Sequence, residues 1–511
     1  MSARASVVGV PGVEVELDGG PLGAPEAAAL AAVQVREVLS TPAQCVLTLY
    51  EPARELAAGL GAELRVSLAG SAEPLFEGEL TAIEYSHGPA REREVRLLAY
   101  DRLHRLRKRA DVRAHVDASP AALARELAGP LGLAVEALAD GPRARYLIQA
   151  GESHYDLLCG LAEAAGLYLC VRRGTLYLLS LEGFGRPVPL ALGHNLLEAR
   201  VELNADRACR RVTARGWDPQ RAAAVTATAG SPRSGRTASA AADPERVGGS
   251  GELWLVGAPL SDAAEAEALA QGHHDRRSAG ELVLRGLAEG DPELRAGTPV
   301  ELGGLAPSLE GRYVISAVTH TLDRERGYLC ELDTAPPAPR TDAARSGRGL
   351  AGSTALGIVT RVDDPDGLGR VRVSLPAFGE VETDWMEVVL PGAGSGKGLV
   401  ALPDEGDRVL VLFASGDASR GLVLGGLYGE DNPPELASSG SSGKRYNLTT
   451  AKGQKIVLDD GGKSLRLENA AGSYVELAPG KVVLHSETKL VIEAPGSGIT
   501  VRGSRIDFEK G

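Results

Sequence analysis

Aromatic and basic residues are both scarce in this sequence. Phe, Trp and Tyr make up 4% of the 511 residues, whereas 64 residues are glycine and 30 are proline. This composition disfavours large aromatic cores and favours many short strands joined by turns. Lys and Arg number 55 against 68 Asp and Glu, which gives a net charge of −13. An acidic chain lacks the positive surface that binds nucleic acid or anionic membranes, so we expect no nucleic-acid partner.

Long hydrophobic runs and a disulfide framework are also missing. No run of about 18 apolar residues occurs, so we expect no membrane-spanning helix. The start, MSARASVVGVPGVEVELDG, has no apolar run as long as that of a signal peptide. An odd number of widely spaced cysteines is typical of buried thiols in a reducing compartment, not of disulfides or a metal site. These cysteines are Cys45, Cys159, Cys170, Cys209 and Cys330.

The strongest pattern lies in residues 356–434, which predict a small closed barrel. In the turn Asp364-Pro365-Asp366-Gly367, Pro365 fixes φ and Gly367 accepts a positive φ. About five short strands in such a stretch predict a five-stranded oligonucleotide/oligosaccharide-binding-type barrel. Alternating runs between Gly, Pro and Asp turn residues mark four of these strands: Gly357–Val362, Gly369–Leu375, Asp407–Phe413 and Gly421–Leu427.

Residues 1–338 predict mainly strands with a few helices. One helix begins after Ser119 as N-cap, with Pro120 at its first position, and a second begins after Ser153 and ends at Gly166. A third runs from Ser261 to about Ala279. Strand runs include Val13–Leu17, Cys45–Leu49, Glu63–Leu68 and Glu94–Ala99, and residues 199–217 predict a strand pair.

This half also contains a low-complexity stretch and two motifs whose functional readings we weighed and set aside. Residues 222–251, rich in Ala, Gly, Ser and Pro, predict a mobile loop. The run Glu152-Ser153-His154 is read as a helix cap beside a surface histidine, because no second acid or oxyanion motif accompanies it. His273 and His274 point about 100° apart on a helix and cannot comfortably share one metal ion.

Residues 444–511 contain a repeat of short strand-like runs. The runs are Lys455–Leu458, Ser464–Leu467, Tyr474–Leu477, Lys481–Leu484, Lys489–Ile492, Ile499–Val501 and Arg505–Phe508. A repeat of about eight residues supplies one strand and one turn, hence one face per chain, whereas a single-chain β-helix needs about 20 residues per coil. A lone apolar face would be an aggregation liability.

Three chains around a threefold axis would bury these apolar columns. We therefore predict a trimer with a C-terminal triple-stranded β-helix or β-prism. The register around Lys481–His485 stays open, because Val482, Val483 and Leu484 are all apolar. The predicted axis residues are Leu465, Leu467, Val475, Leu477, Leu490, Ile492, Ile499, Val501, Ile506 and Phe508.

The barrel stretch resembles a known family. Four segments occur in an order that resembles the barrel of contractile-machine spikes: DDPDGLGRVRVSLP, DWMEVVLPGAG, PDEGDRVLVLF and VLGGLYGEDNPP. These comprise the VgrG proteins of type VI secretion, the baseplate spikes of contractile phages and, most similar, the spikes of phage-tail-like injection particles. The motif residues of this resemblance are Asp364, Pro365, Gly369, Arg370, Trp385, Pro391, Gly406, Asp407, Gly416, Asp417 and Gly425.

The segment RYLIQAGESHYDLLCGLAEAAGLYLCVRRGTLYLLS resembles the hub part of the same family. The resemblance implies a mainly β protein of hub-like β-barrel domains (residues 1–338), a linker (339–355), the barrel (356–434), a second linker (435–443) and a β-helix needle (444–511). It also implies that a trimer joins the inner tube and baseplate to a needle that pierces the target envelope.

The implied partners are the chain itself as a homotrimer, an inner tube or tube-initiator protein, baseplate wedge proteins, a PAAR-type tip protein at the C-terminus and toxin cargo. We expect no catalytic residue, cofactor or metal, because the paired carboxylates lie in turns and the loop GAGSGKG departs from the phosphate-loop pattern. Assembly is expected in the cytoplasm and action in a particle that is released outside the cell. Two other functions stay open: a VgrG that carries effectors, and a carbohydrate-binding tail fibre or adhesin.

Overall fold

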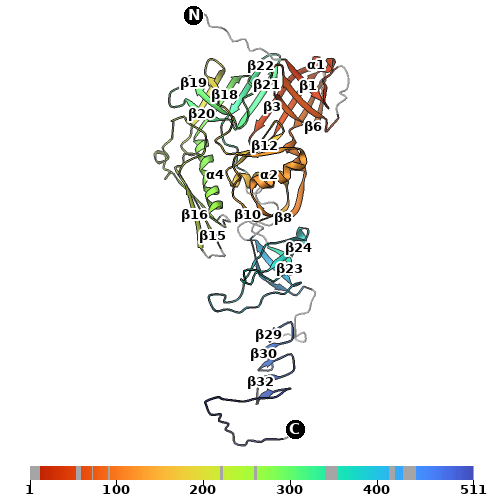
Figure 1. The fold of residues 1–511 in the computed structure, drawn as a ribbon, viewed down its shortest axis with the longest axis vertical. Coiled ribbons are helices and arrows are strands. Elements are labelled where there is room, and N and C mark those ends of the chain that lie inside the picture. The colour runs from red at the N-terminus through yellow and green to blue at the C-terminus, as the bar shows by residue number, and fades with distance from the viewer. Residues whose placement is uncertain are drawn as a thin grey trace. The chain divides into compact units, whose positions relative to one another are not determined.

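The computed structural model describes residues 12–52, 59–71, 73–89, 93–218, 223–257, 260, 262–339, 354–413, 420–429 and 445–509. Its contacts divide the chain into two compact units, Met1–Gly426 and Leu427–Gly511, each described here by itself. Strands far outnumber helices among the elements, so the predicted mainly β fold class is confirmed (Figure 1). Within the described part of the chain, no helix combines the length and apolar content needed to cross a bilayer.

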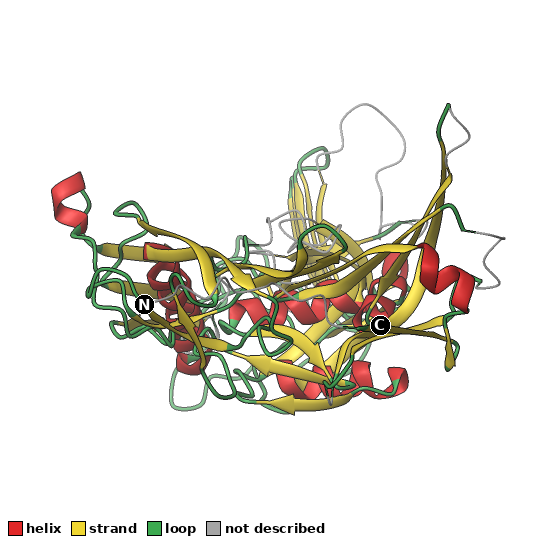
Figure 2. Ribbon diagram, turned by 90° about the horizontal axis from the view of Figure 1, so that it is seen from above, coloured by secondary structure: helices red, strands yellow, loops and turns green. Residues whose placement is uncertain are grey.

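An antiparallel sheet of 11 strands forms the largest element of the first unit, and long twisted strands dominate its view from above (Figure 2). Strand β21 pairs with β3 and thereby joins the first strands of the chain to strands some 300 residues later. The predicted hub-like barrels therefore share one continuous sheet. In spatial order the sheet contains β14 (Leu196–Leu203), β18 (Leu282–Glu289), β22 (Gly327–Asp333), β21 (Ala317–Asp323), β3 (Leu30–Val38), β4 (Thr41–Tyr50), β7 (Arg93–Tyr100), β6 (Pro74–His87), β5 (Glu63–Leu68), β1 (Val13–Leu17) and β2 (Gly20–Pro21).

A helical subdomain follows this first set of strands. Its two helices start as predicted: the Ser119 side chain accepts a hydrogen bond from the Ala122 amide (3.2 Å), and Ser153 accepts one from the Asp156 amide (3.1 Å). His154 was expected at the surface, which is wrong, because it is 7% exposed and lies 2.9 Å from Asp111. The elements are η1 (Arg102–Lys108), β8 (Ala110–Ala118), α2 (Pro120–Ala128), β9 (Ala134–Ala137), β10 (Ala144–Ser153), α3 (His154–Ala164), β11 (Tyr168–Arg172) and β12 (Thr175–Leu179).

A second subdomain packs a three-stranded sheet on helix α4 (Ala263–Glu281). The sheet has the order β16 (Ala223–Ala229), β15 (Arg211–Asp218), β17 (Glu252–Val256). The predicted pairing within residues 199–217 is wrong, because β14 pairs with β18 whereas β15 pairs with β16 and β17. Periodicity identifies a strand but not its partner. A third small sheet contains β13 (Val188–Ala191), β19 (Pro299–Gly303) and β20 (Gly311–Val314).

The loop predicted at residues 222–251 is structured over much of its length. Residues 223–229 form β16, and two buried carboxylates of α4 hold the irregular part that follows. Asp275 accepts a hydrogen bond from the Arg233 amide (2.6 Å), and Glu281 accepts one from the Ala242 amide (2.7 Å). The loop prediction failed because the helix supplies acceptors that the segment's own composition does not reveal. The helix also runs on to Glu281, beyond its predicted end at about Ala279.

The barrel consists of β23 (Thr354–Arg361), β24 (Arg372–Leu375), β25 (Val381–Glu382), β26 (Glu387–Val388), β27 (Arg408–Phe413) and β28 (Gly421–Leu427). Its strand order is β25-β24-β23-β27-β28-β26, and a bridge between Val371 and Met386 closes it. Its interior is filled by buried aliphatic side chains and by Phe413, which is fully buried. The predicted closed barrel is therefore confirmed.

The second unit contains a five-stranded antiparallel meander, here called the C-terminal sheet. Its strands are β29 (Arg445–Thr449), β30 (Lys455–Asp459), β31 (Ser464–Glu468), β32 (Tyr474–Ala478) and β33 (Lys481–His485). The predicted strands at Lys489–Ile492, Ile499–Val501 and Arg505–Phe508 are not formed in the described residues. A strand needs a paired neighbour, and the single chain provides none to these runs.

The turn between β23 and β24 is built on a buried ion pair. Arg370 is 2% exposed, and its guanidinium donates to Asp364 at 2.7 and 3.0 Å. Asp364 also accepts from the amides of Asp366 and Leu368, while Gly367 has φ 66° as predicted. The Arg370 hydrogen bonds hold the pKa of the Asp364 carboxyl well below its usual range. The pair thus contributes stability that is present above about pH 4 and is lost as pH falls towards this lowered pKa.

We predict that Asp364→Asn destabilises the barrel by about 2–4 kcal/mol, because it leaves a buried guanidinium with only Asp366 as charged partner. Asp366→Asn is the matched control: its side chain is 58% exposed, so its loss should cost less than about 1 kcal/mol. Thermal unfolding, with hydrogen–deuterium exchange on β23 and β24, measures both. Equal effects of the two substitutions would contradict this account.

Candidate functional site at the barrel and the C-terminal sheet

The barrel is attached to the rest of the first unit through one face of the β8–β10 sheet. Residues on this face, among them Ile148 and Tyr146, pack into the barrel's hydrophobic core cluster, and Ile148 is 4% exposed. Leu147 points to the opposite face and packs against the helical subdomain. The two-stranded sheet is therefore covered on both sides, by the barrel and by helices.

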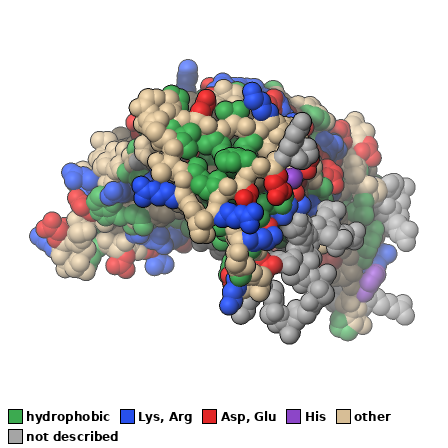
Figure 3. All heavy atoms as spheres, turned by 90° about the horizontal axis from the view of Figure 1, so that it is seen from below, with side chains coloured by type: hydrophobic (Ala, Val, Ile, Leu, Met, Phe, Trp, Pro, Cys, Tyr) green, Lys and Arg blue, Asp and Glu red, His purple; other side chains and the backbone are tan. Residues whose placement is uncertain are grey.

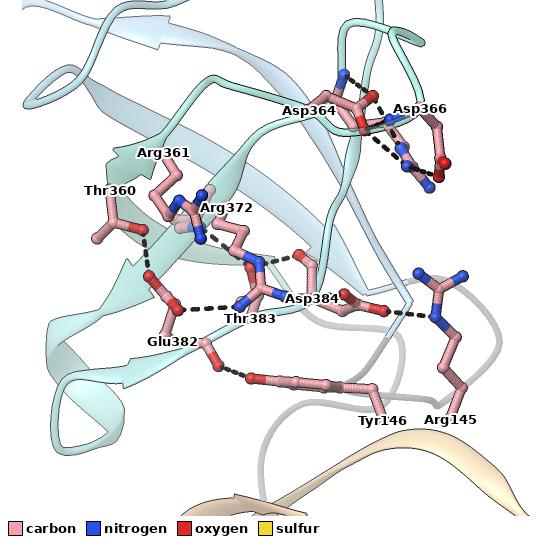
Figure 4. Close-up of polar contacts among 12 residues, drawn as sticks. Arg145, Tyr146, Thr360, Arg361, Asp364, Asp366, Arg372, Glu382, Thr383 and Asp384 are labelled. Atoms are coloured by element: carbon pink, nitrogen blue, oxygen red, sulfur yellow. Dashed lines mark hydrogen bonds and ion pairs between the residues drawn. The ribbon is translucent and has the colours of Figure 1, made fainter. Parts of the chain in front are cut away.

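Polar contacts surround this apolar contact (Figure 4). The Tyr146 hydroxyl donates to the Glu382 carbonyl at 2.6 Å, and Arg145 lies 3.6 Å from the Asp384 carboxylate. Arg372 of the barrel pairs with Glu382 (3.1 Å) and orients its side chain. Burial raises the pKa of Tyr146, so its hydroxyl stays a donor across the neutral range.

A second contact joins the barrel to helix α4. The Arg420 guanidinium, just before β28, lies 3.0 Å from the Glu265 carboxylate in the first turn of α4. Both side chains are mostly buried, at 28% and 16% exposure. The barrel is thus held by two subdomains whose contact residues lie more than 100 residues apart in the sequence.

The predicted motif residues are distributed around the barrel. Asp364, Pro365, Gly369 and Arg370 meet in the β23–β24 turn, and Trp385 lies between the guanidiniums of Arg361 and Arg372, at 5.5 and 5.3 Å. Three other motif residues make hydrogen bonds in loops. The Pro391 carbonyl accepts from the Leu399 amide, and the Gly406 amide donates to the Val359 carbonyl. The Asp407 carboxylate accepts from the Asp404 amide. Gly425 lies on β28, and Gly416 and Asp417 lie outside the described residues.

Sequence reasoning missed the roles of Glu382, Asp384 and Ile148 in the junction. The signal that could have found them is the composition of β10, whose neighbouring residues Tyr146, Leu147 and Ile148 are all apolar or aromatic. A strand that is apolar on both faces is typical of burial on both sides. The sequence does not reveal which part of the chain covers each face.

The C-terminal sheet carries an apolar face made of two continuous columns. Pairing aligns Tyr446, Leu458, Leu465, Leu477 and Val482 in one column, and Leu448, Ile456, Leu467, Val475 and Leu484 in the other. The four predicted axis residues of these strands lie on this face. Val482 and Leu484 also join it, while Val483 points away, which resolves the register that the sequence left open.

This apolar face is uncovered in the single chain. Leu477 is 45% exposed, Leu484 is 56% and Val482 is 72%. The predicted axis residues beyond β33 are also exposed: Leu490, Ile492, Ile499, Val501, Ile506 and Phe508. The opposite face is polar, with Arg466 3.8 Å above the Tyr474 ring and His485 stacked on the same ring at 4.9 Å.

The thiols do not have the properties of nucleophiles. All five cysteines are buried, and burial raises the pKa of Cys170 and Cys330 to about 12. Among the residues that the structure describes, no group of three or more His, Cys, Asp and Glu side chains is placed to hold a metal ion.

We predict that Ile148→Ala loosens the barrel junction by about 2–4 kcal/mol, because it opens a cavity where β10 enters the barrel's core. Hydrogen–deuterium exchange should then rise in β24 and β25. Leu147→Ala is the matched control: it removes a similar side chain from the opposite face of β10 and should leave exchange in the barrel unchanged. If other contacts mainly held the junction, hydrogen–deuterium exchange in the barrel would be the same in both variants, which would contradict this prediction.

Comparisons with known proteins agree with this architecture. A family model described as the type VI secretion system/phage-baseplate injector OB domain matches residues 355–428, and a model described as the phage tail baseplate hub (GPD) matches residues 36–325. A comparison with curated proteins found no match.

Solved structures with the same fold have low sequence identity. The E. coli c3393 protein, a component of the type VI secretion system, is 14% identical, with 81% of this chain and 99% of that chain covered and a TM-score of 0.53. The Francisella PdpA–VgrG complex in its half-lidded form contains a chain that is 8% identical, with 93% and 88% covered and a TM-score of 0.54. A 43 kDa tail protein of prophage MuSo2 from Shewanella oneidensis is 15% identical, with 64% and 98% covered and a TM-score of 0.50.

These likenesses support the fold, and the hub match covers more than half of the sequence. The chain therefore belongs to the phage tail baseplate hub (GPD) family and is a structural hub and spike of a contractile injection machine.

Proposed function

We propose that three copies of this chain join through their C-terminal sheets into a needle. The trimer would cap the inner tube, nucleate the baseplate and be driven forward when the sheath contracts. The needle would then pierce the target envelope. In this mechanism the barrel transmits force from the hub to the needle and keeps the two coaxial.

The observation that carries this proposal is the uncovered two-column face of the C-terminal sheet. Ten large apolar side chains line this face, and most of them are at least one-third exposed. Full burial of one such side chain contributes about 1.5–3 kcal/mol, so completing the burial of ten half-covered ones is worth on the order of 10 kcal/mol per chain. A face of this kind is stable in water only when another surface covers it.

The resemblance to the spike family favours three copies over two. Three narrow sheets around one axis bury all three faces against each other and leave the polar faces outside. Two copies would form a two-layered sandwich, whose twofold symmetry would not match that of a threefold hub. Interstrand hydrogen bonds and a dry axis would give the needle the rigidity that a piercing device needs.

We also assign partners and location within this proposal. The hub would contact an inner tube or tube-initiator protein and baseplate wedge proteins. The exposed segment after β33 would receive a PAAR-type tip protein, and the hub would have room for toxin cargo. The chain would act mechanically, without catalysis of its own, in a phage-tail-like particle assembled in the cytoplasm and released from the cell.

We predict that Leu477→Asp weakens self-association at least about tenfold, because a carboxylate would have to be buried in the middle of an apolar column. Sedimentation velocity over a dilution series measures this change. The neighbouring Glu476→Gln, which lies on the polar face opposite Arg466, is the control and should leave association unchanged. A monomer in the unsubstituted protein, or equal effects of both substitutions, would refute the threefold needle.

Deletion of residues 497–511 should abolish capture of a PAAR-type tip protein in a pull-down while the trimer is retained. The reason is that this end carries exposed Ile499, Val501 and Phe508, which need a cap. Unchanged capture by the shortened chain would place the tip protein elsewhere.

A further inference from the structure

Three adjacent strands of the barrel are apolar on both faces. Their inward side chains, such as Val409, Val411 and Phe413, fill the core. Six of their outward side chains are aliphatic as well, and these form what we call the outer barrel face: Leu356 and Ile358 on β23, Leu410 and Leu412 on β27, and Leu422 and Leu424 on β28. Polar residues, namely Thr354, Thr360 and Arg408, border this face. The pairing of Leu356 with Leu410 places the two side by side.

The outer barrel face is only partly covered in the chain, with Leu410, Leu412 and Leu422 half-buried. Leu356 is 62% exposed, and Ile358 and Leu424 are each 39% exposed. A barrel in water normally alternates apolar residues inside with polar residues outside, and strands apolar on both faces are typical of burial on both sides. Hydrophobic side chains that gather on the surface are visible when the molecule is viewed from below (Figure 3). The outer barrel face therefore needs a cover.

The same barrel presents a second apolar feature of different shape. Residues 391–402 form a loop in which every residue is exposed, and its base touches the barrel where the Leu402 side chain lies beside Gly369. Near its base it carries Leu399 (49% exposed), Val400 (74%) and Leu402 (41%). A bridge between Gly394 and Lys397 and a hydrogen bond from the Leu399 amide to Pro391 give it a defined hairpin-like form.

We propose that the loop of residues 391–402 of one copy seats its aliphatic side chains on the outer barrel face of the next copy. This inference rests on the proposed threefold assembly and assigns the contact that closes the ring of barrels. A closed threefold ring has head-to-tail contacts, which require two different complementary patches on each copy. The barrel has one flat patch and one protruding patch, both apolar and both exposed at least in part.

Other occupants of the outer barrel face are less well matched. The apolar columns of the C-terminal sheet are already required by the needle itself. A separate partner protein would cover the flat patch but would leave Leu399, Val400 and Leu402 of the loop in water. The contact between copies covers both patches at once, and it makes the barrels contribute to the trimer independently of the needle.

Cysteine cross-linking of the full-length chain tests this contact. Leu356→Cys and Val400→Cys are introduced singly and together, and a short flexible bis-maleimide is added. The native cysteines are all buried, so the unsubstituted protein is the control for their reactivity. We expect covalent trimers from the double variant, and no cross-linked species from either single variant.

Any other cross-linking result would contradict the proposed contact in a distinct way. Cross-linking of Leu356→Cys alone would show that outer faces meet each other, and cross-linking of Val400→Cys alone would show that loops meet; either overturns the proposal. Only intrachain links in the double variant would show that the loop covers its own barrel. No cross-link in a protein that sediments as a trimer would refute this contact while leaving the threefold assembly intact. A monomer on sedimentation would refute the proposed function itself.

A second measurement uses substitutions outside the barrel core. Val400→Asp should raise the concentration at which the trimer dissociates at least tenfold, because it places a carboxylate in the proposed apolar contact. Ser395→Asp, at the tip of the same loop, is the matched control and should change it less than twofold. Equal behaviour of the two variants would overturn the proposal.

Discussion

A strand that is apolar on both faces must be covered on both sides, and much of this structure depends on how that need is met. In β10 the chain meets it internally, since Tyr146 and Ile148 face the barrel and Leu147 faces helices. In β23, β27 and β28 the chain covers the inner side fully and the outer side only in part. In the C-terminal sheet one whole face is left open. In the proposed assembly, the same hydrophobic requirement that fixes the barrel onto the hub sets where other copies bind.

In the proposed function the barrel acts as a coupling and not as a ligand-binding module. Its fold is shared with domains that bind oligonucleotides and oligosaccharides, but fold alone does not establish function. Tyr146 and Glu265 anchor it to two separate subdomains, and its turn is stiffened by the buried Asp364–Arg370 pair. These contacts are those expected of a part that must keep its orientation under load.

Local patterns predicted the strands and caps well. The bounds of Val13–Leu17, Glu63–Leu68 and Gly421–Leu427 agree with the structure, and Ser119 and Ser153 cap their helices as expected. Alternation of side chains and N-cap chemistry are short-range effects, so a few residues suffice to reveal them. The barrel was predictable for the same reason, because its strands are close in sequence and separated by clear turns.

Long-range partners could not be predicted in this way. The pairing of β3 with β21 and the buried Asp275 that holds Arg233 depend on segments far apart in the sequence. The shared apolar face of β31 and β32 was predictable, whereas Ile492, Ile499 and Phe508 were placed in strands that the described single chain does not form. Such strands need backbone partners, which in this account come from other copies.

The central claim is that three copies share the apolar faces that one copy leaves open. Native mass spectrometry of the unsubstituted full-length chain tests it most directly. The account predicts one dominant species at three times the 53.1 kDa of the single chain, stable on dilution to the nanomolar range. A dominant monomer or dimer under the same conditions would contradict it.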